Sequence, residues 1–84
     1  MDQEPTKDLR RGRLKGRYTN YFEVGHNAFE FIIDCGEQYA ETSTEQFHTR
    51  LVTTPGYAQV LLETLQGSID RYERTFGPIP KHEE

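Results

Sequence analysis

One long amphipathic segment in the second half of the chain constrains the fold more than any other feature. Its apolar side chains recur at intervals of four and three residues, which is the period of an α-helix. Thr54 can cap the amino end of such a helix, and Pro55 suits its first turn. Gly77 and Pro78 are typical of a carboxyl end. The sequence therefore predicts a helix over residues 55–76, about 33 Å long. The apolar positions are Ala58, Leu61, Leu62, Leu65, Ile69, Tyr72 and Phe76.

Upstream of the helix, three segments alternate apolar and polar side chains with a period of two, which predicts β-strands. Residues 17–24 and 28–35 are separated by turn-forming residues at 25–27, so a β-hairpin is expected. Residues 46–53 predict a third strand. It should be antiparallel to the second, because the polar loop 36–45 is too short for a crossover helix. The expected fold class is α+β, a three-stranded antiparallel sheet followed by one long amphipathic helix.

The alternation assigns the strand side chains to two faces of this sheet. The helix can cover only one face, and that face is expected to form the core with it. Its strand residues are Phe22, Val24, Phe29, Phe31, Ile33, Cys35, Phe47 and Leu51. The helix is expected to contribute Leu62, Leu65, Ile69 and Tyr72 to the core. A contiguous apolar set on the other face is typical of an interface. That set is Tyr21, Ala28, Ile32 and Val52.

Charge is distributed unevenly along the 84 residues. The net charge of -4 is the sum of +3 over residues 1–17 and -7 over the remainder. Residues 1–16 have no apolar period and cannot bury enough surface to offset their ordering entropy, so a disordered basic arm is expected there. A single α+β domain is expected over residues 17–79, followed by a flexible tail over residues 80–84.

Composition excludes several classes of protein. No apolar stretch is long enough to span a bilayer, and the first residues do not resemble a secretory leader, so a cytoplasmic location is expected. The single cysteine, Cys35, excludes an intramolecular disulfide. Cys35 and His48 are the one thiol–imidazole combination, but the predicted alternation places them on opposite faces, unlike a nucleophile and its base.

Metal and phosphate sites are not indicated either. His26, Glu30, Asp34 and His48 match no known metal-ligand spacing. The segment T-T-P-G-Y at the predicted helix start lacks the further glycines and the lysine of a phosphate-binding loop. We therefore expect no catalytic, cofactor-binding or metal site, and no enzymatic activity.

Four blocks of the chain resemble a known family. They are Y-T-N-Y-F-E-V-G-H, E-F-I-I-D-C-G, H-T-R-L-V-T-T-P-G-Y-A-Q-V-L-L and I-D-R-Y-E-R-T-F-G-P-I. In this order they resemble a family of small bacterial and archaeal proteins that is catalogued as a domain of unknown function. The resemblance runs from Tyr18 to Ile79 and supports the fold, but it implies no activity, cofactor or site.

Two functional hypotheses remain. The first is a non-enzymatic protein-interaction or scaffold module acting as a homodimer, because so short a folded region buries little surface alone. Its interface is expected on the sheet face away from the helix or on an open sheet edge. The alternative is a nucleic-acid-associated protein that binds phosphates through the arm over residues 9–17. The basic residues of that arm are Arg10, Arg11, Arg13, Lys15 and Arg17.

Overall fold

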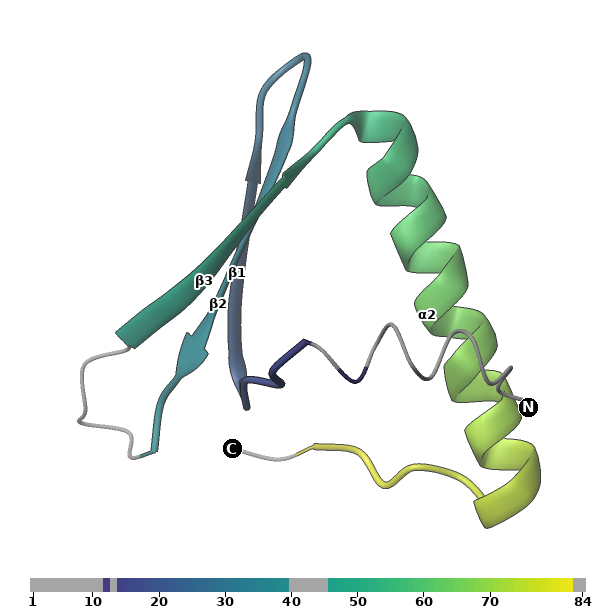
Figure 1. The fold of residues 1–84 in the computed structure, drawn as a ribbon. Helices are drawn as coiled ribbons and strands as arrows, with labels where there is room; N and C mark the ends of the chain where they lie inside the picture. Colours follow the sequence, from purple (N-terminus) through teal and green to yellow (C-terminus); the bar gives the residue numbers. More distant parts are fainter. Residues whose placement is uncertain (1–11, 13, 40–45, 83–84) are drawn as a thin grey trace.

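The chain forms a three-stranded sheet followed by a single helix (Figure 1). The computed structural model describes residues 12, 14–39 and 46–82. The elements, in chain order, are β1 (Tyr21–His26), β2 (Phe31–Glu37), β3 (Gln46–Thr53) and α2 (Pro55–Phe76). The sheet is antiparallel, with strand order β1-β2-β3. The predicted α+β fold is confirmed. Most of the predicted arm, and residues 83–84 of the predicted tail, lie outside the described residues.

The hairpin turn lies later in the chain than the sequence pattern predicted. β1 continues through Gly25 and His26, and the turn begins at Asn27. The side-chain Oδ1 of Asn27 accepts hydrogen bonds from the backbone N–H groups of Phe29 and Glu30, each at 2.8 Å. This bonding is typical of asparagine in turns. It removes Phe29 from the strand and leaves its side chain 80% exposed at the tip of the hairpin. The assignment of Phe29 to the core was therefore wrong.

A β-bulge interrupts the pairing of β2 with β3. Cys35 pairs with Thr49 and Gly36 pairs with Phe47, so His48 is an extra residue in β3. An extra residue shifts the alternation of all residues that precede it in the strand. Phe47 therefore lies on the sheet face away from the helix, where its ring contacts that of Tyr21 with centroids 5.7 Å apart. The prediction that Phe47 shares a face with Leu51 was wrong for this reason.

The helix begins and ends where the sequence predicted. The backbone N–H of Tyr57 donates to Oγ1 of Thr54 at 3.2 Å, which caps the amino end. At the other end Gly77 adopts a φ of 94°, and its N–H donates to the carbonyl of Glu73 at 2.9 Å. Glycine is suited to this position because a side chain there would be strained.

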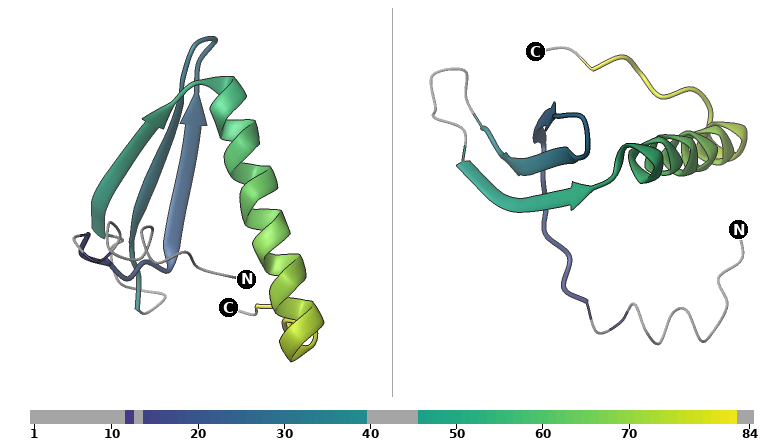
Figure 2. Two further views of the ribbon diagram at one scale, coloured as in Figure 1. Left: turned by 45° about the vertical axis from the view of Figure 1, so that its right-hand side comes forward. Right: turned by 90° about the horizontal axis from the view of Figure 1, so that it is seen from above.

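The sheet and the helix diverge from Thr54, the residue that joins them (Figure 1). No hydrophobic side chain in the described part of the chain is buried. Close contacts between elements are concentrated within the sheet. Figures 1 and 2 show α2 leaving the end of β3 and leaning away from the strands. Leu62 is 64% exposed and Leu65 is 56% exposed. The predicted core is therefore not closed within a single chain.

Gly36 is the one buried residue among those described, and its lack of a side chain makes the bulge possible. A Cβ at this position would collide with the carbonyl oxygen of Gln46 and lie 2.9 Å from the Cα of Phe47. Both neighbours belong to backbone that is held in the sheet, so they cannot move aside easily.

We expect Gly36→Ala to lower the free energy of unfolding by about 1–3 kcal/mol, the usual cost of overpacking. Urea denaturation followed by circular dichroism measures this change. Gly25→Ala is the matched control, because a Cβ at Gly25 would meet no atom within 4 Å. Equal stability of the two variants would show that the backbone at the bulge is not tightly packed.

Candidate interaction surface

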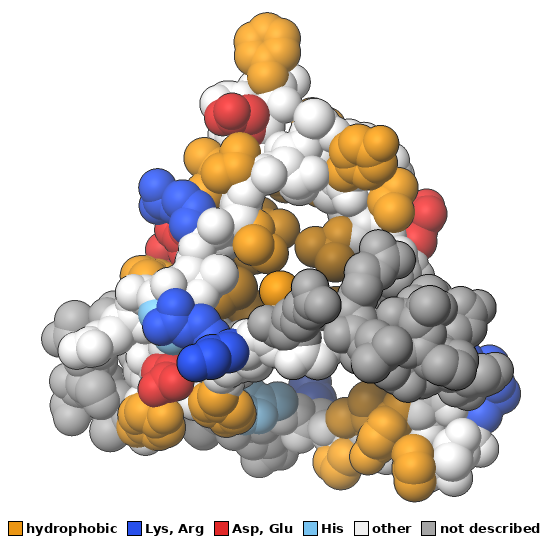
Figure 3. Space-filling view, in the orientation of Figure 1, with side chains coloured by type: hydrophobic (Ala, Val, Ile, Leu, Met, Phe, Trp, Pro, Cys, Tyr) orange, Lys and Arg blue, Asp and Glu red, His pale blue; other side chains and the backbone are white. Residues whose placement is uncertain are grey.

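An apolar groove separates the sheet from the helix. It has a volume of about 630 Å³. Phe22 and Val24 of β1 and Phe31 and Ile33 of β2 line one wall. The helix wall consists of Pro55, Ala58, Gln59, Leu61, Leu62 and Leu65. Figure 3 shows hydrophobic side chains gathered around this hollow. A contiguous exposed hydrophobic surface usually marks an interaction site.

The strand register explains why these particular side chains meet at one wall. Val24 pairs with Ile33, and Ile33 pairs with Leu51, so all three lie on the same face. Directly paired residues in an antiparallel sheet project to the same side. Cys35 joins this face through its pairing with Phe22, and it is a partly exposed free thiol. The face predicted to lie under the helix is thus the face that turns toward it, except for Phe29 and Phe47.

The apolar stripe of the helix extends beyond the groove. Leu65 is the last helix residue that lines it, whereas the stripe continues through Ile69, Tyr72 and Phe76. Tyr72 and Phe76 contact each other with ring centroids 5.0 Å apart, but they are 50% and 72% exposed. Nearly half of the stripe therefore has no sheet residues opposite it in the groove.

A single residue, Thr54, connects β3 to α2. Its φ of -83° and ψ of 162° are extended, as expected for a residue before proline. The same residue caps the helix, and its carbonyl accepts a hydrogen bond from the N–H of Ala58 at 2.8 Å. Because Thr54 bonds to the first helical turn and directly follows the last residue of β3, it fixes the direction in which the helix leaves the sheet.

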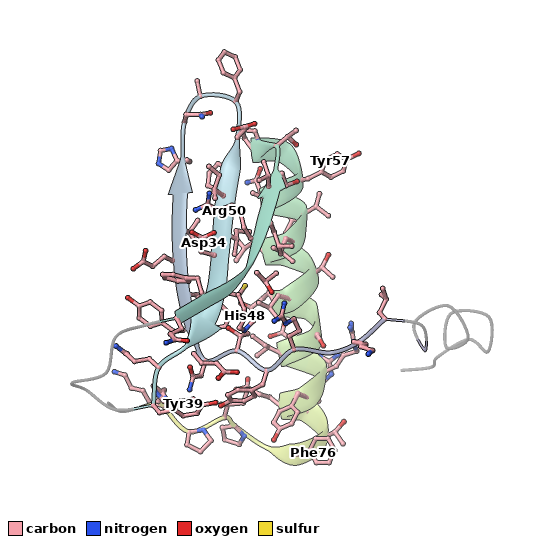
Figure 4. All side chains as sticks on the ribbon, turned by 60° about the vertical axis from the view of Figure 1, so that its left-hand side comes forward. Asp34, Tyr39, His48, Arg50, Tyr57 and Phe76 are labelled. Carbon is pink, nitrogen blue, oxygen red and sulfur yellow. The ribbon has the colours of Figure 1, made fainter. Side chains whose placement is uncertain are left out.

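The opposite sheet face, predicted as the interface, is partly charged. Asp34 and Arg50 pair directly across β2 and β3, and Figure 4 shows them side by side. Nε of Arg50 donates to Oδ1 of Asp34 at 2.7 Å, and Nη2 donates to Oδ2 at 2.8 Å. The bidentate hydrogen bond, supported by the Coulomb attraction, lowers the pKa of the Asp34 carboxyl from its ordinary value.

The predicted interface residues are spread over this face and its end. Ile32 pairs with Val52 next to the charged pair, and Tyr21 lies further along, beside Phe47. The hydroxyl of Tyr21 donates to the carboxylate of Glu23 at 3.0 Å. Ala28 lies in the hairpin turn instead of on the strand. The structure thus brings Ile32 and Val52 together, but it does not bring Ala28 to them.

Residues 17–20, which precede β1, are hydrogen-bonded to the end of the sheet. The side-chain amide of Asn20 makes two hydrogen bonds with the backbone of Gln38, at 2.9 and 3.1 Å. Nη1 of Arg17 donates to the carbonyl of His48 at 3.2 Å. One ring nitrogen of His48 lies 3.0 Å from the carbonyl oxygen of Tyr18, and the other lies 2.7 Å from the Thr49 hydroxyl. These contacts give His48 a structural role at the bulge.

The remaining sequence-based candidates can be placed only in part. Lys15 is exposed, and Arg17 is used in the contact with His48. Arg10, Arg11 and Arg13 lie outside the described residues. Within residues 12, 14–39 and 46–82, no three His, Cys, Asp or Glu side chains are arranged to hold a metal ion. No helix in these ranges combines the length and apolar character needed to span a membrane.

Comparison with protein families identifies a match over nearly the whole chain. The family described as "Protein of unknown function (DUF3467)" matches residues 2–81. The chain belongs to this family. Searches of the curated proteins and of the solved structures gave no match. The resemblance noted from the sequence blocks is confirmed, and membership in this family assigns no activity.

We expect Arg50→Gln to raise the pKa of Asp34 toward the ordinary value of about 3.9, because it removes the donors that favour the carboxylate. The pKa is lowered in the folded chain, so the pair contributes stability above the unfolded pKa and loses it as the pH falls through the folded pKa. Carboxyl carbon-13 NMR over an acid titration measures the pKa of Asp34 in the unchanged chain and in the variant. Arg74→Gln, at the far end of the helix, serves as the control. An unchanged Asp34 pKa in Arg50→Gln would contradict the pairing.

Proposed function

We propose that the protein is a non-enzymatic interaction module that acts as a homodimeric scaffold. The observation that carries the proposal is the absence of any buried hydrophobic side chain in the described part of the chain. Burial of apolar surface is the dominant favourable term in folding, and a stable domain needs it. A second polypeptide that covers the groove provides this burial.

The overall dimensions support the same proposal. The chain exposes 7741 Å² of accessible surface, whereas a compact monomer of this mass exposes about 5,200 Å². Its radius of gyration is 15.5 Å, compared with about 12 Å for a compact domain of this length. The two walls of the groove contribute to this exposed surface, since Phe22, Val24, Leu62 and Leu65 are all more than half exposed. Surplus surface of this kind is typical of subunits that fold together.

The polar features favour an interaction module over the alternatives. The Asp34–Arg50 pair and the contacts of His48 join neighbouring structural elements of the chain to each other. Arg17, one of the candidate phosphate contacts, donates to a backbone carbonyl of the same chain. The body that follows the arm carries a net charge of -7, which repels a nucleic-acid backbone.

We expect light scattering after size-exclusion chromatography to give the mass of two chains over a wide dilution series. Because folding and association are linked, the denaturation midpoint should rise with protein concentration. A mass of one chain at every concentration, with a midpoint independent of concentration, would overturn the proposal. Adding short RNA or DNA at two salt concentrations, followed by fluorescence anisotropy, tests the nucleic-acid alternative in the same preparation.

Paired variants show which surface holds the dimer together. Leu65→Asp places a charge in the groove. We expect it to reduce both the fraction of dimer and the free energy of unfolding. The double variant Ile32→Asp with Val52→Asp changes the opposite sheet face, and we expect it to leave the dimer intact. A dimer lost only in the double variant would move the interface to the face that the sequence predicted.

A further inference from the structure

We propose that the groove of each copy is occupied by helix α2 of a second copy, so that two chains exchange their helices. This inference rests on the proposed homodimer and specifies how it is built. In this arrangement the apolar stripe of one helix covers the sheet wall of its partner, and the partner's helix covers the first sheet in return. The interface of the dimer is thus formed by the sheet wall and the α2 stripe, the two apolar surfaces that are exposed in a single chain.

The sheet wall needs an apolar occupant. Phe22 and Val24 are 58% and 60% exposed, although they lie in the strand face that turns toward the helix. Exposed side chains of this type are stabilised when a complementary apolar surface removes them from water. The wall carries no charged side chain among the residues that line the groove. A charged peptide or a nucleic acid therefore has nothing to pair with there.

Part of the helix stripe lies beyond the groove of its own chain. The stripe runs from Ala58 to Phe76, but the groove ends at Leu65. Tyr72 and Phe76, which are 50% and 72% exposed, therefore lack a counterpart in the groove of their own chain, whereas Ile69 is half-buried. The groove ends at Leu65 because α2 leans away from its own sheet (Figure 1). The sheet wall of a second copy has the same length, but a helix from another chain is not held at the angle set by Thr54, so it can lie along that wall and bring more of its stripe against the strands.

The connection at Thr54 opposes the simplest alternative, in which the helix closes onto its own sheet. Closure requires a change in the backbone at Thr54 or Pro55, because no other residue separates strand from helix. Proline fixes its own φ and restricts the residue before it, and the cap on Tyr57 holds Thr54 in place. A second copy fills the groove without altering these torsion angles.

Symmetry makes a second copy a better occupant than an unrelated chain. An isologous interface uses the same patch on both subunits, so one patch must contain both the inserted element and its receptor. This chain carries both, as the stripe of α2 and the sheet wall.

Disulfide trapping between differently tagged chains tests the exchange. One chain keeps Cys35 on its sheet wall. The other carries Cys35→Ser together with one new cysteine, Leu62→Cys, Leu65→Cys or Ile69→Cys, along the stripe. The chains are unfolded together, refolded as a mixture and oxidised mildly. We expect at least one stripe position to give about tenfold more mixed disulfide than Arg74→Cys on the polar side, because a disulfide requires Cα atoms within about 7 Å.

The outcomes separate this inference from the proposed function. A dimer by light scattering that gives no mixed disulfide above the Arg74→Cys control at any stripe position would overturn helix exchange while leaving the homodimer intact. A single chain that retains Cys35, carries Leu65→Cys and forms only an intramolecular disulfide would show closure onto its own sheet, and would also overturn the exchange. A mass of one chain at all concentrations would overturn the proposed homodimer itself.

Discussion

The backbone at Thr54 determines the shape of this protein. Thr54 directly follows β3, precedes a proline and caps α2 through its side chain, so strand and helix meet with no flexible loop between them. Proline and the residue before it have a narrow range of torsion angles. The helix therefore leaves the sheet at a set angle, and the groove between them is a consequence of that angle.

The open groove leaves the fold without its usual source of stability. Folding of a domain this small leaves a net stability of only a few kcal/mol, and apolar burial provides most of the favourable term. Here the sheet is stabilised by its backbone pairing, by the bidentate Asp34–Arg50 contact and by the hydrogen bonds between the Asn20 side chain and the backbone of Gln38. These polar interactions specify the register and the strand order. They do not replace a hydrophobic core, because each exchanges hydrogen bonds with water for hydrogen bonds within the protein.

The sequence predicted the elements well where their signals are local. The helix bounds follow from the side chains of Thr54, Pro55 and Gly77, which act within one turn. Residues 46–53 also emerged as a strand with the observed bounds. The bulge at His48 was missed because alternation assumes a regular strand, and one extra residue reverses the face of Phe47. Gly36 was assigned to the loop after the second strand, whereas β2 includes it and ends at Glu37. Placed inside the strand, it would have been a signal, since a glycine there often marks a bulge.

The open core could not be predicted from alternation and helical period, because both patterns show that a face is apolar without showing what covers it. The stripe of α2 is the same whether it packs on its own sheet or on that of another copy. What separates the two cases is the angle at Thr54, which depends on three-dimensional geometry. In the proposed dimer the outer sheet faces, with Asp34 and Arg50, point away from the exchanged helices on both subunits. Each outer face carries the apolar pair Ile32 and Val52 beside the charged Asp34–Arg50 pair, so the proposed dimer presents the same surface twice, related by a two-fold axis.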